Sequence, residues 1–205
     1  GYKRGVESGE AIGTQHETQE ELHLIKPYND PHVIAGQGSI VLELVDQLRD
    51  AGAKASSLLC CCGGGGLSAG LATALHSLAK DITLHTVEPE GFDDTARSLS
   101  LGERVTNATE QGSICDAIVT PTPGELTFPV LKRYAGPGFA VSDMAVLNAM
   151  KVAFDTLKLV IEPGGAVALA AALDPATLPD DQELVVVASG GNVDERVFQQ
   201  ALQFA

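Results

Sequence analysis

Four consecutive glycines, Gly63 to Gly66, separate an apolar segment that predicts a β-strand, Ser57–Cys62, from a segment with helical spacing that begins near Leu67. Because glycine has no side chain, the backbone can turn tightly there and successive N–H groups can converge on one anion. The N-terminal end of the following helix adds the positive end of its dipole. This order of strand, glycines and helix predicts a site for a phosphate group.

A glycine-rich turn without a ligand is the alternative, although four glycines in a row cost conformational entropy without a packing return. Nucleotide-binding motifs fit less well. The run is not followed by the Lys and Ser or Thr of a P-loop, and its glycines lack the spacing of a dinucleotide-binding fingerprint. Glu88 does stand roughly 20 residues further on, where that fingerprint has an acidic residue, so this alternative stays open.

Apolar periodicity predicts an alternation of strands and helices along the chain. In chain order, the expected elements are a helix over Gly38–Arg49, the strand Ser57–Cys62, a helix over Ser68–Ala79, a strand over Ile82–Val87, a short helix over Asp94–Leu99, a long helix capped by Ser142 or Asp143, and a strand over Leu184–Ala188. Such alternation is typical of an α/β fold, in which helices flank a parallel sheet. Only Gly102–Gly138 is a long stretch without a clear period.

Two of these segments also carry an expectation about burial. The unbroken apolar run Leu184–Ala188 predicts a fully buried parallel strand. In the long helix, four apolar side chains form one stripe that we expect to face the core, namely Val146, Met150, Ala153 and Leu157. A short amphipathic helix is also indicated near Glu17–Leu24.

The charge balance excludes some classes of partner. The chain has 13 Lys and Arg against 27 Asp and Glu, a formal net charge of −14, which should repel the phosphates of nucleic acids. No apolar run reaches the roughly 18 residues of a membrane-spanning helix, and the N-terminus does not have the pattern of a signal peptide. We therefore expect neither nucleic acid nor a membrane as a partner, and a cytoplasmic location.

Three of the four cysteines are adjacent, Cys60 to Cys62. This spacing suits neither a disulfide framework nor the separated pairs of a zinc site. In a strand, Cys60 and Cys62 would face one way and Cys61 the other. We interpret them as small apolar core side chains in reducing surroundings, with a redox or metal role as the alternative.

A second loop, Ser189-Gly190-Gly191-Asn192, follows the last predicted strand. Ligand sites in open parallel sheets gather at the carboxyl ends of strands, and this loop places a hydroxyl there. These residue types are also common in ordinary turns. The loop therefore indicates a ligand site only in combination with the glycine run.

With these two loops, the sequence resembles the fold-type-II pyridoxal-phosphate enzymes, in the branch of the threonine and serine dehydratases and serine racemase. The resemblance covers about residues 26–197 and rests on five segments in the family's order, which are Pro31–Ser39, Gly63–Gly66, Val87-Glu88-Pro89, Ile161–Ala166 and Ser189–Asn192. It implies a tryptophan-synthase-β-like α/β fold that is incomplete at its N-terminus. Residues 1–30 would be a remnant of the small domain or its connection, and residues 31–205 most of the large pyridoxal-phosphate-binding domain.

The resemblance also implies roles for individual residues. The backbone of Gly63, Gly64, Gly65, Gly66 and Leu67 would hold the phosphate of pyridoxal 5'-phosphate, and Ser189 with Gly190 would meet the pyridine nitrogen. A neutral hydroxyl does not enforce a positively charged ring, which weakens the ring as an electron sink and suits substrates whose β-substituent leaves quickly.

Further residues are implied at the substrate and at a cation. Thr122, within the segment Thr120–Gly124, and Glu162 would line the substrate pocket, with plain loop or capping roles as the alternative. Glu88, the backbone oxygen of Phe92 and Asp94 would bind Mg²⁺ or another divalent cation, which prefers oxygen ligands. A solvated acidic loop is the alternative there.

The family's Schiff-base lysine, which stands in a Ser-Phe-Lys-x-Arg-Gly type of motif, has no intact counterpart, and neither has its Ser-x-Gly-Asn-His segment. Gly1–Gly5 echoes the lysine motif only faintly, and we interpret Lys3 as a coincidence. Five further lysines fall at helix ends or on polar faces, namely Lys54, Lys80, Lys132, Lys151 and Lys158. We therefore expect the chain to begin within the small domain, and to be inactive as a lyase in isolation.

The reaction implied for the intact enzyme is that of an ammonia-lyase acting on L-serine, L-threonine or a related 3-hydroxy amino acid, with racemisation as a second outcome. We expect a homodimer, and no C-terminal regulatory domain or isoleucine feedback. Two other functions stay open. One is a non-catalytic phosphate-binding or pyridoxal-phosphate-binding module, and the other is β-replacement of the cysteine synthase type, although that group usually interrupts its glycines with threonine.

Overall fold

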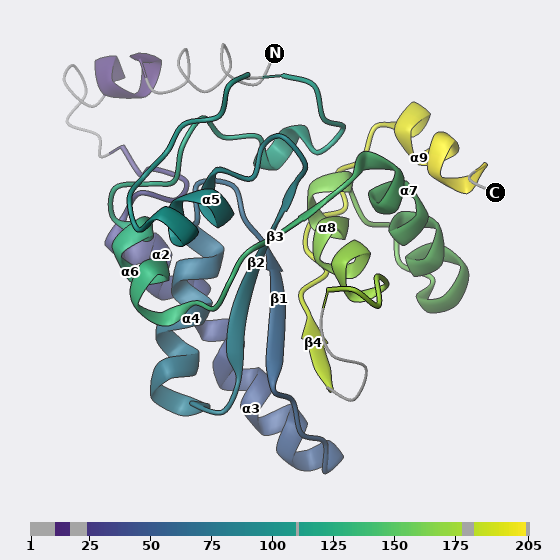
Figure 1. Cartoon of the computed structure of the whole chain (residues 1–205), viewed down its shortest axis with the longest axis horizontal. Helices are drawn as coiled ribbons and strands as arrows, with labels where there is room; N and C mark the ends of the chain where they lie inside the picture. Colours follow the sequence, from purple (N-terminus) through teal and green to yellow (C-terminus); the bar gives the residue numbers. More distant parts are fainter. Residues whose placement is uncertain (1–10, 17–23, 110, 178–182, 204–205) are drawn as a thin grey trace.

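The computed structural model describes residues 11–16, 24–109, 111–177 and 183–203. Its centre is a four-stranded sheet with the strand order β3-β2-β1-β4 (Figure 1). The strands are β1 (Ser57–Cys61), β2 (Thr83–Pro89), β3 (Phe139–Val141) and β4 (Leu184–Val186). All three neighbouring pairs run parallel, so the predicted parallel sheet is confirmed.

Helices cover both faces of this sheet (Figure 1). Helix α4 packs with α2, α3 and α6 on one side, and on the other side α7 packs with both α8 and α9. Their bounds are α2 (Pro31–Gln37), α3 (Ser39–Ala51), α4 (Gly66–Leu78), α5 (Asp94–Leu101), α6 (Thr127–Tyr134), α7 (Asp143–Val152), α8 (Pro163–Ala172) and α9 (Glu195–Leu202). Among the described residues, no helix is long and apolar enough to cross a bilayer.

Strand β1 is the centre of the core. Leu58, Leu59 and Cys60 have no exposed surface, as expected for a strand with a neighbour on each side and helices on both faces. The cysteines alternate as predicted, because Cys60 accepts a hydrogen bond from Ser68 on α4 whereas Cys61 contacts the loop after β4. The four cysteines of the chain are free thiols.

The prediction of a fully buried strand over Leu184–Ala188 is wrong. Strand β4 is shorter, Leu184–Val186, and is half-buried throughout, while Ala188 is exposed. It pairs with β1 alone, so it forms an edge of the sheet in the described part of the chain. The apolar run therefore predicted a strand correctly, but it could not show whether this strand lies at the edge or in the centre of the sheet.

Helix α7 confirms the predicted cap and most of the predicted stripe. Ser142 is the N-cap, and its Oγ accepts a hydrogen bond from the backbone N–H of Ala145 at 3.2 Å. Val146 and Met150 are fully buried, but the prediction for Leu157 is wrong, because this side chain is 57% exposed. Residues 153–157 form a π-helical turn, η2, whose wider winding rotates later side chains off the stripe.

Helices also occur where no period was evident. Helix α6 and a short 3₁₀ turn, η1 (Asp116–Ile118), lie within the stretch expected to be irregular, Gly102–Gly138. Helix α2 begins at Pro31, with Asp30 as its N-cap, and α9 follows the second loop. The helix expected near Glu17–Leu24 falls largely on residues outside the described part.

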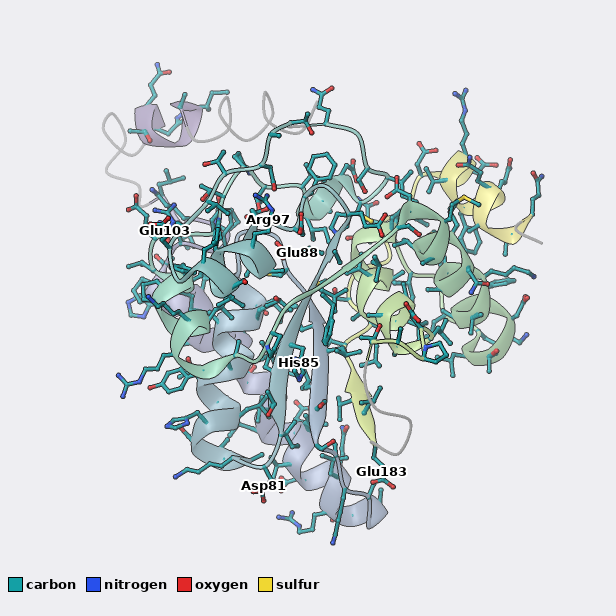
Figure 2. The ribbon with its side chains drawn as sticks, in the orientation of Figure 1. Asp81, His85, Glu88, Arg97, Glu103 and Glu183 are labelled. Atoms are coloured by element: carbon teal, nitrogen blue, oxygen red, sulfur yellow. The ribbon has the colours of Figure 1, made fainter. Side chains whose placement is uncertain are left out.

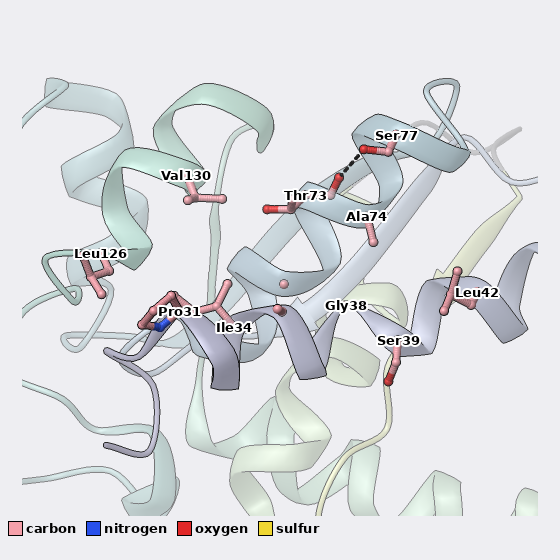
Figure 3. Close-up of a pocket in the computed structure, with 12 residues that line it drawn as sticks. Pro31, Ile34, Gly38, Ser39, Leu42, Thr73, Ala74, Ser77, Leu126 and Val130 are labelled. Carbon is pink, nitrogen blue, oxygen red and sulfur yellow. Dashed lines mark hydrogen bonds between the residues drawn. The ribbon is translucent and has the colours of Figure 1, made fainter. Parts of the chain in front are cut away.

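An apolar groove of about 620 Å³ runs between α2, α3, α4 and α6 (Figure 3). Its walls include Ile34, Leu42 and Val130. No ionisable side chain lines it, so it offers no group for acid–base chemistry.

Candidate functional site

The glycine loop joins the end of β1 to the start of α4. Within the described part of the chain, the backbone N–H groups from Gly63 to Ser68 have no hydrogen-bond acceptor, although Gly64, Gly65 and Gly66 are buried. Buried amides are almost always paired in folded proteins. A row of unpaired amides at a helix N-terminus therefore fits an anionic ligand with several acceptor atoms.

The other side of the loop is held by close packing. A Cβ on Gly64 would lie 2.3 Å from ring carbons of Tyr28, and Gly65 has a φ of +90° beside Thr127. The carbonyl oxygen of Gly64 accepts hydrogen bonds from Thr127 Oγ1 at 2.6 Å and from the N–H of Gly124 at 3.1 Å. The close packing thus requires glycine at Gly64 and Gly65 independently of any ligand, and it fixes the loop in place.

Ser189 lies close to the glycine loop. Its Oγ is 3.2 Å from Sγ of Cys61, the last residue of β1, and the two residues from Cys61 to Gly63 span at most roughly 7 Å. Strands β1 and β4 are parallel neighbours, so both loops leave the same edge of the sheet. This is the carboxyl edge, where ligand sites of open α/β sheets form.

The position of Ser189 depends on the start of α8. A Cβ on Gly165 would lie 1.3 Å from the carbonyl oxygen of Ser189, so only glycine permits this approach. Glu162 holds the rest of the loop, since its Oε2 accepts a hydrogen bond from the N–H of Asn192 at 3.0 Å and its own N–H donates to the oxygen of Gly190 at 3.2 Å. Gly190 itself has a φ of +69°, which favours glycine.

The thiol of Cys61 has an unusual environment for a buried cysteine. Hydrogen bonding from Cys60 and, to a smaller extent, from Ser189 lowers the pKa of Cys61 to about 7, against the effects of burial and of the charge of Glu162. Cys115 behaves in the ordinary way, because burial raises its pKa to about 12. The interpretation of Cys61 as a plain apolar side chain is therefore incomplete.

Glu88 lies near the end of β2 (Figure 2), and Asp94 is the first residue of α5, which follows that strand. Both oxygens of Glu88 accept backbone hydrogen bonds, from Thr95 at 2.9 Å and from Ala96 at 2.8 Å. Oδ1 of Asp94 accepts from Asn107 at 2.6 Å, but its Oδ2 is buried and has no partner among the described residues.

Burial raises the pKa of both carboxyl groups. For Asp94 the pKa rises to about 7, and the charge of Asp94 adds to the effect of burial in raising the pKa of Glu88 well above its ordinary value. Two buried acids with one unpaired oxygen fit a hard cation. No cluster of three or more His, Cys, Asp or Glu side chains with the arrangement of a metal site occurs in the described ranges, so a cation would also need the Phe92 carbonyl or water.

The two residues expected at the substrate do not come together. Thr122 lines a polar cavity of about 210 Å³ beside Tyr28, which also includes Lys26 and Arg104. Glu162 lines a separate cavity of about 590 Å³. Thr122 thus lies in the cavity beside Tyr28 and Gly124, whereas Glu162 lies beside the Ser189 loop.

The described lysines lie on the surface. Lys54, Lys80, Lys132 and Lys158 are exposed, and the half-buried Lys151 pairs with Asp155 at 2.7 Å, which confirms them as solvated charges. Lys26 is exposed too. Lys3 lies outside the described residues.

A parallel α/β sheet, a glycine loop with unpaired amides and a serine at the neighbouring strand end define the pyridoxal-phosphate-dependent enzymes of fold type II. The chain belongs to this family, since the model for "Pyridoxal-phosphate dependent enzyme" matches residues 2–190.

Within the family, the chain is similar to serine racemases and threonine ammonia-lyases. Serine racemase from Oryza sativa subsp. indica is 31% identical over 207 residues, which cover 96% of this chain and 58% of the relative. L-threonine ammonia-lyase from Thermotoga maritima is 32% identical over 87% of this chain and 43% of the relative. The structure of maize serine racemase superposes with a TM-score of 0.84 and 32% identity, over 96% of this chain and 61% of that one. The chain thus spans about half the length of these relatives.

Proposed function

We propose that the chain binds pyridoxal 5'-phosphate, with the phosphate on the backbone of Gly63–Leu67 and the pyridine nitrogen at Ser189 and Gly190. We further propose that it serves an ammonia-lyase acting on L-serine, L-threonine or a related 3-hydroxy amino acid. The row of unpaired buried amides, on the same sheet edge as Ser189, carries this proposal. The names of its relatives support the reaction class.

The residues of this chain would bind and orient the cofactor, and they would not themselves transfer protons. When bound, the cofactor would supply an electron sink that eases loss of the α-proton and the β-hydroxyl, which is the chemistry of an elimination that yields a 2-oxo acid and ammonia. The loop amides would fix the phosphate. Ser189 would meet the ring nitrogen as a neutral group, so it would not force a positive charge on the ring.

No described lysine lies where it could carry the cofactor, so the 205-residue chain is not expected to turn over unaided. The division of the chain at residue 30 stays a prediction, and Tyr28 and Asn29, just before it, already contact Gly64 and Leu126. A homodimer, a cytoplasmic location and an amino-acid substrate belong to the same proposal.

The proposal includes a divalent cation at Glu88, the carbonyl of Phe92 and Asp94. The unpaired Oδ2 of Asp94 supports it. The oxygens of Glu88 each keep a lone pair beyond those used by Thr95 and Ala96. Glu162 and Thr122 stay proposed as substrate-binding residues, each from the separate cavity that it lines.

The binding half of the proposal is tested by titrating the purified chain with pyridoxal 5'-phosphate and following visible absorption. We expect saturable 1:1 binding that inorganic phosphate competes for. Borohydride reduction followed by mass spectrometry should leave no covalent adduct, because no lysine of the described residues lies at the proposed site. An adduct on Lys3 would contradict the interpretation of that residue as a coincidence, and absence of binding would contradict the proposal itself.

The reaction half is tested with the cofactor-loaded chain and a small primary amine, which substitutes for the absent lysine amine. Elimination predicts a 2-oxo acid from L-serine, L-threonine or L-threo-3-hydroxyaspartate, above the rate with cofactor and amine alone. Added sulfide should not divert the product to cysteine. Cysteine formation would favour β-replacement, and cofactor binding without either product would favour the non-catalytic module.

A further inference from the structure

The thiol of Cys61 contacts the hydroxyl that the proposed function places at the ring nitrogen. Cys61 Sγ and Ser189 Oγ are 3.2 Å apart, and either atom can be the donor. Cys61 is only 7% exposed, so water competes little for this contact. The pair joins the ends of two neighbouring strands, β1 and β4.

The titratable groups that surround this thiol come from three parts of the chain. Cys60 is its neighbour on β1, Glu162 stands at the start of α8, and Cys115 directly precedes η1. Cys115 stays protonated at neutral pH, because burial raises its pKa to about 12. The hydrogen bond to Cys61 together with burial raises the pKa of Cys60, and burial raises the pKa of Cys62. Cys61 is thus the one thiol of the four with a lowered pKa, and its Sγ lies against Ser189 Oγ.

A serine hydroxyl has one hydrogen and two acceptor lone pairs. When the thiol is protonated it can donate to Ser189 Oγ, which leaves the hydroxyl hydrogen free for an unprotonated ring nitrogen. When the thiol is ionised it attracts the hydroxyl hydrogen, and Ser189 Oγ can then only accept from a protonated ring nitrogen. We propose, on the basis of the proposed function, that Cys61 is a positioning residue that sets, through Ser189, whether this site donates to or accepts from the cofactor's ring nitrogen.

The test uses the purified 205-residue chain, with pyridoxal 5'-phosphate as the probe, and measures both affinity and the absorption of the bound cofactor from pH 5.5 to 8.5. In the unsubstituted chain, the absorption should change in a step near neutral pH. Cys61→Ser keeps a hydrogen-bonding group but does not ionise, so affinity should stay within about twofold while the step disappears. Cys61→Ala should lose the step and weaken binding roughly 2- to 10-fold, the usual effect of one lost hydrogen bond.

Two variants control for indirect effects. Cys62→Ala removes a buried thiol from the opposite face of the strand, where it contacts Thr95, and should keep both the step and the affinity. Ser189→Ala should abolish the step, because the thiol loses its connection to the ring. If Cys61→Ala does not fold, Cys61→Val tests the same loss with the space filled.

Two failures are distinguishable. No binding of the cofactor by the unsubstituted chain would overturn the proposed function. Normal binding with a pH step that persists in Cys61→Ser and in Cys61→Ala or Cys61→Val would overturn the role of Cys61 and leave the proposed function intact.

Discussion

Single residues at the start of α8 decide where the second loop lies. Gly165 is the clearest case, because any side chain there would overlap the carbonyl oxygen of Ser189. Neighbouring Gly164 is different, since a Cβ there would meet Ile118 at 3.4 Å, an ordinary contact. The two glycines look alike in the sequence and differ only in what lies beside them.

Gly165→Ala should therefore displace Ser189 while leaving the glycine loop in place. We expect pyridoxal 5'-phosphate to bind at least about tenfold more weakly, binding of inorganic phosphate to change less than about twofold, and stability to fall by about 1–3 kcal/mol from overpacking. Isothermal titration and urea unfolding measure these effects. Gly164→Ala is the matched control, and an equal loss of cofactor affinity in both variants would contradict the account.

Asp94 makes the stability of the folded chain depend on pH, and the direction of this dependence follows from its pKa. Its pKa is raised by burial from its ordinary value to about 7 in the folded chain, so between about pH 4 and pH 7 the folded state holds the proton more tightly than the unfolded state. Stability should fall as pH rises through this window, by at most about 1.4 kcal/mol per pH unit. Glu88, whose pKa is also raised, acts in the same direction.

Urea unfolding at pH 5.5 and 7.5 measures this effect. Asp94→Asn should flatten the pH dependence. If Asp94 binds a divalent cation, Mg²⁺ should stabilise the unsubstituted chain at pH 7.5, have less effect at pH 5.5, and have little effect on Asp94→Asn at either pH. Equal stabilisation of both proteins by Mg²⁺ would place the cation elsewhere.

At the scale of elements, the sequence predicted those parts whose pattern is local. The strand before the glycines, helices α3, α4 and α5, and the Ser142 cap needed only periodicity and turn chemistry. Helices α6 and α9 were missed although both are amphipathic and as long as α5, which was predicted, so a local signal for them was present in the sequence. The edge position of β4 depends on strand order, which no local pattern contains.

The site was predictable to the same extent. The glycine loop and the Ser189 loop could be located from motifs, and their meeting at one edge follows from parallel strands. The contacts of Tyr28, Thr127 and Cys61 could not be predicted, because each joins segments more than 30 residues apart. The close glycines of the Ile161–Ala166 motif were the one available signal for the approach of Ser189.

The N-terminus of α4 provides a test at the scale of an element. Leu67→Asp places a negative charge in its first turn, beside the unpaired amides, where it would repel a phosphate; the helix dipole itself tolerates an acid there. We expect affinity for pyridoxal 5'-phosphate to fall roughly tenfold, measured by absorption titration. Leu78→Asp makes the same change at the exposed far end of α4 and should leave affinity nearly unchanged. Equal effects of both variants would argue against phosphate at the loop.

At the scale of the whole molecule, the net charge of −14 opposes the approach of an anionic cofactor. Salt screens this repulsion, with a Debye length of about 30 Å at 0.01 M and 10 Å at 0.1 M. Stopped-flow association of pyridoxal 5'-phosphate should therefore speed up by roughly 2- to 5-fold over this range. Pyridoxal, which lacks the phosphate, should show little change, and a slower association of the phosphate form in salt would contradict this expectation.

We propose above that the amides between β1 and α4 bind the phosphate of pyridoxal 5'-phosphate. Backbone amide NMR of the ¹⁵N-labelled chain during titration with pyridoxal 5'-phosphate tests it most directly. We expect the largest shifts on Gly63 to Ser68 with a second group around Ser189, and we expect inorganic phosphate to shift only the first group. Shifts centred on other segments, with the glycine amides unchanged, would contradict it.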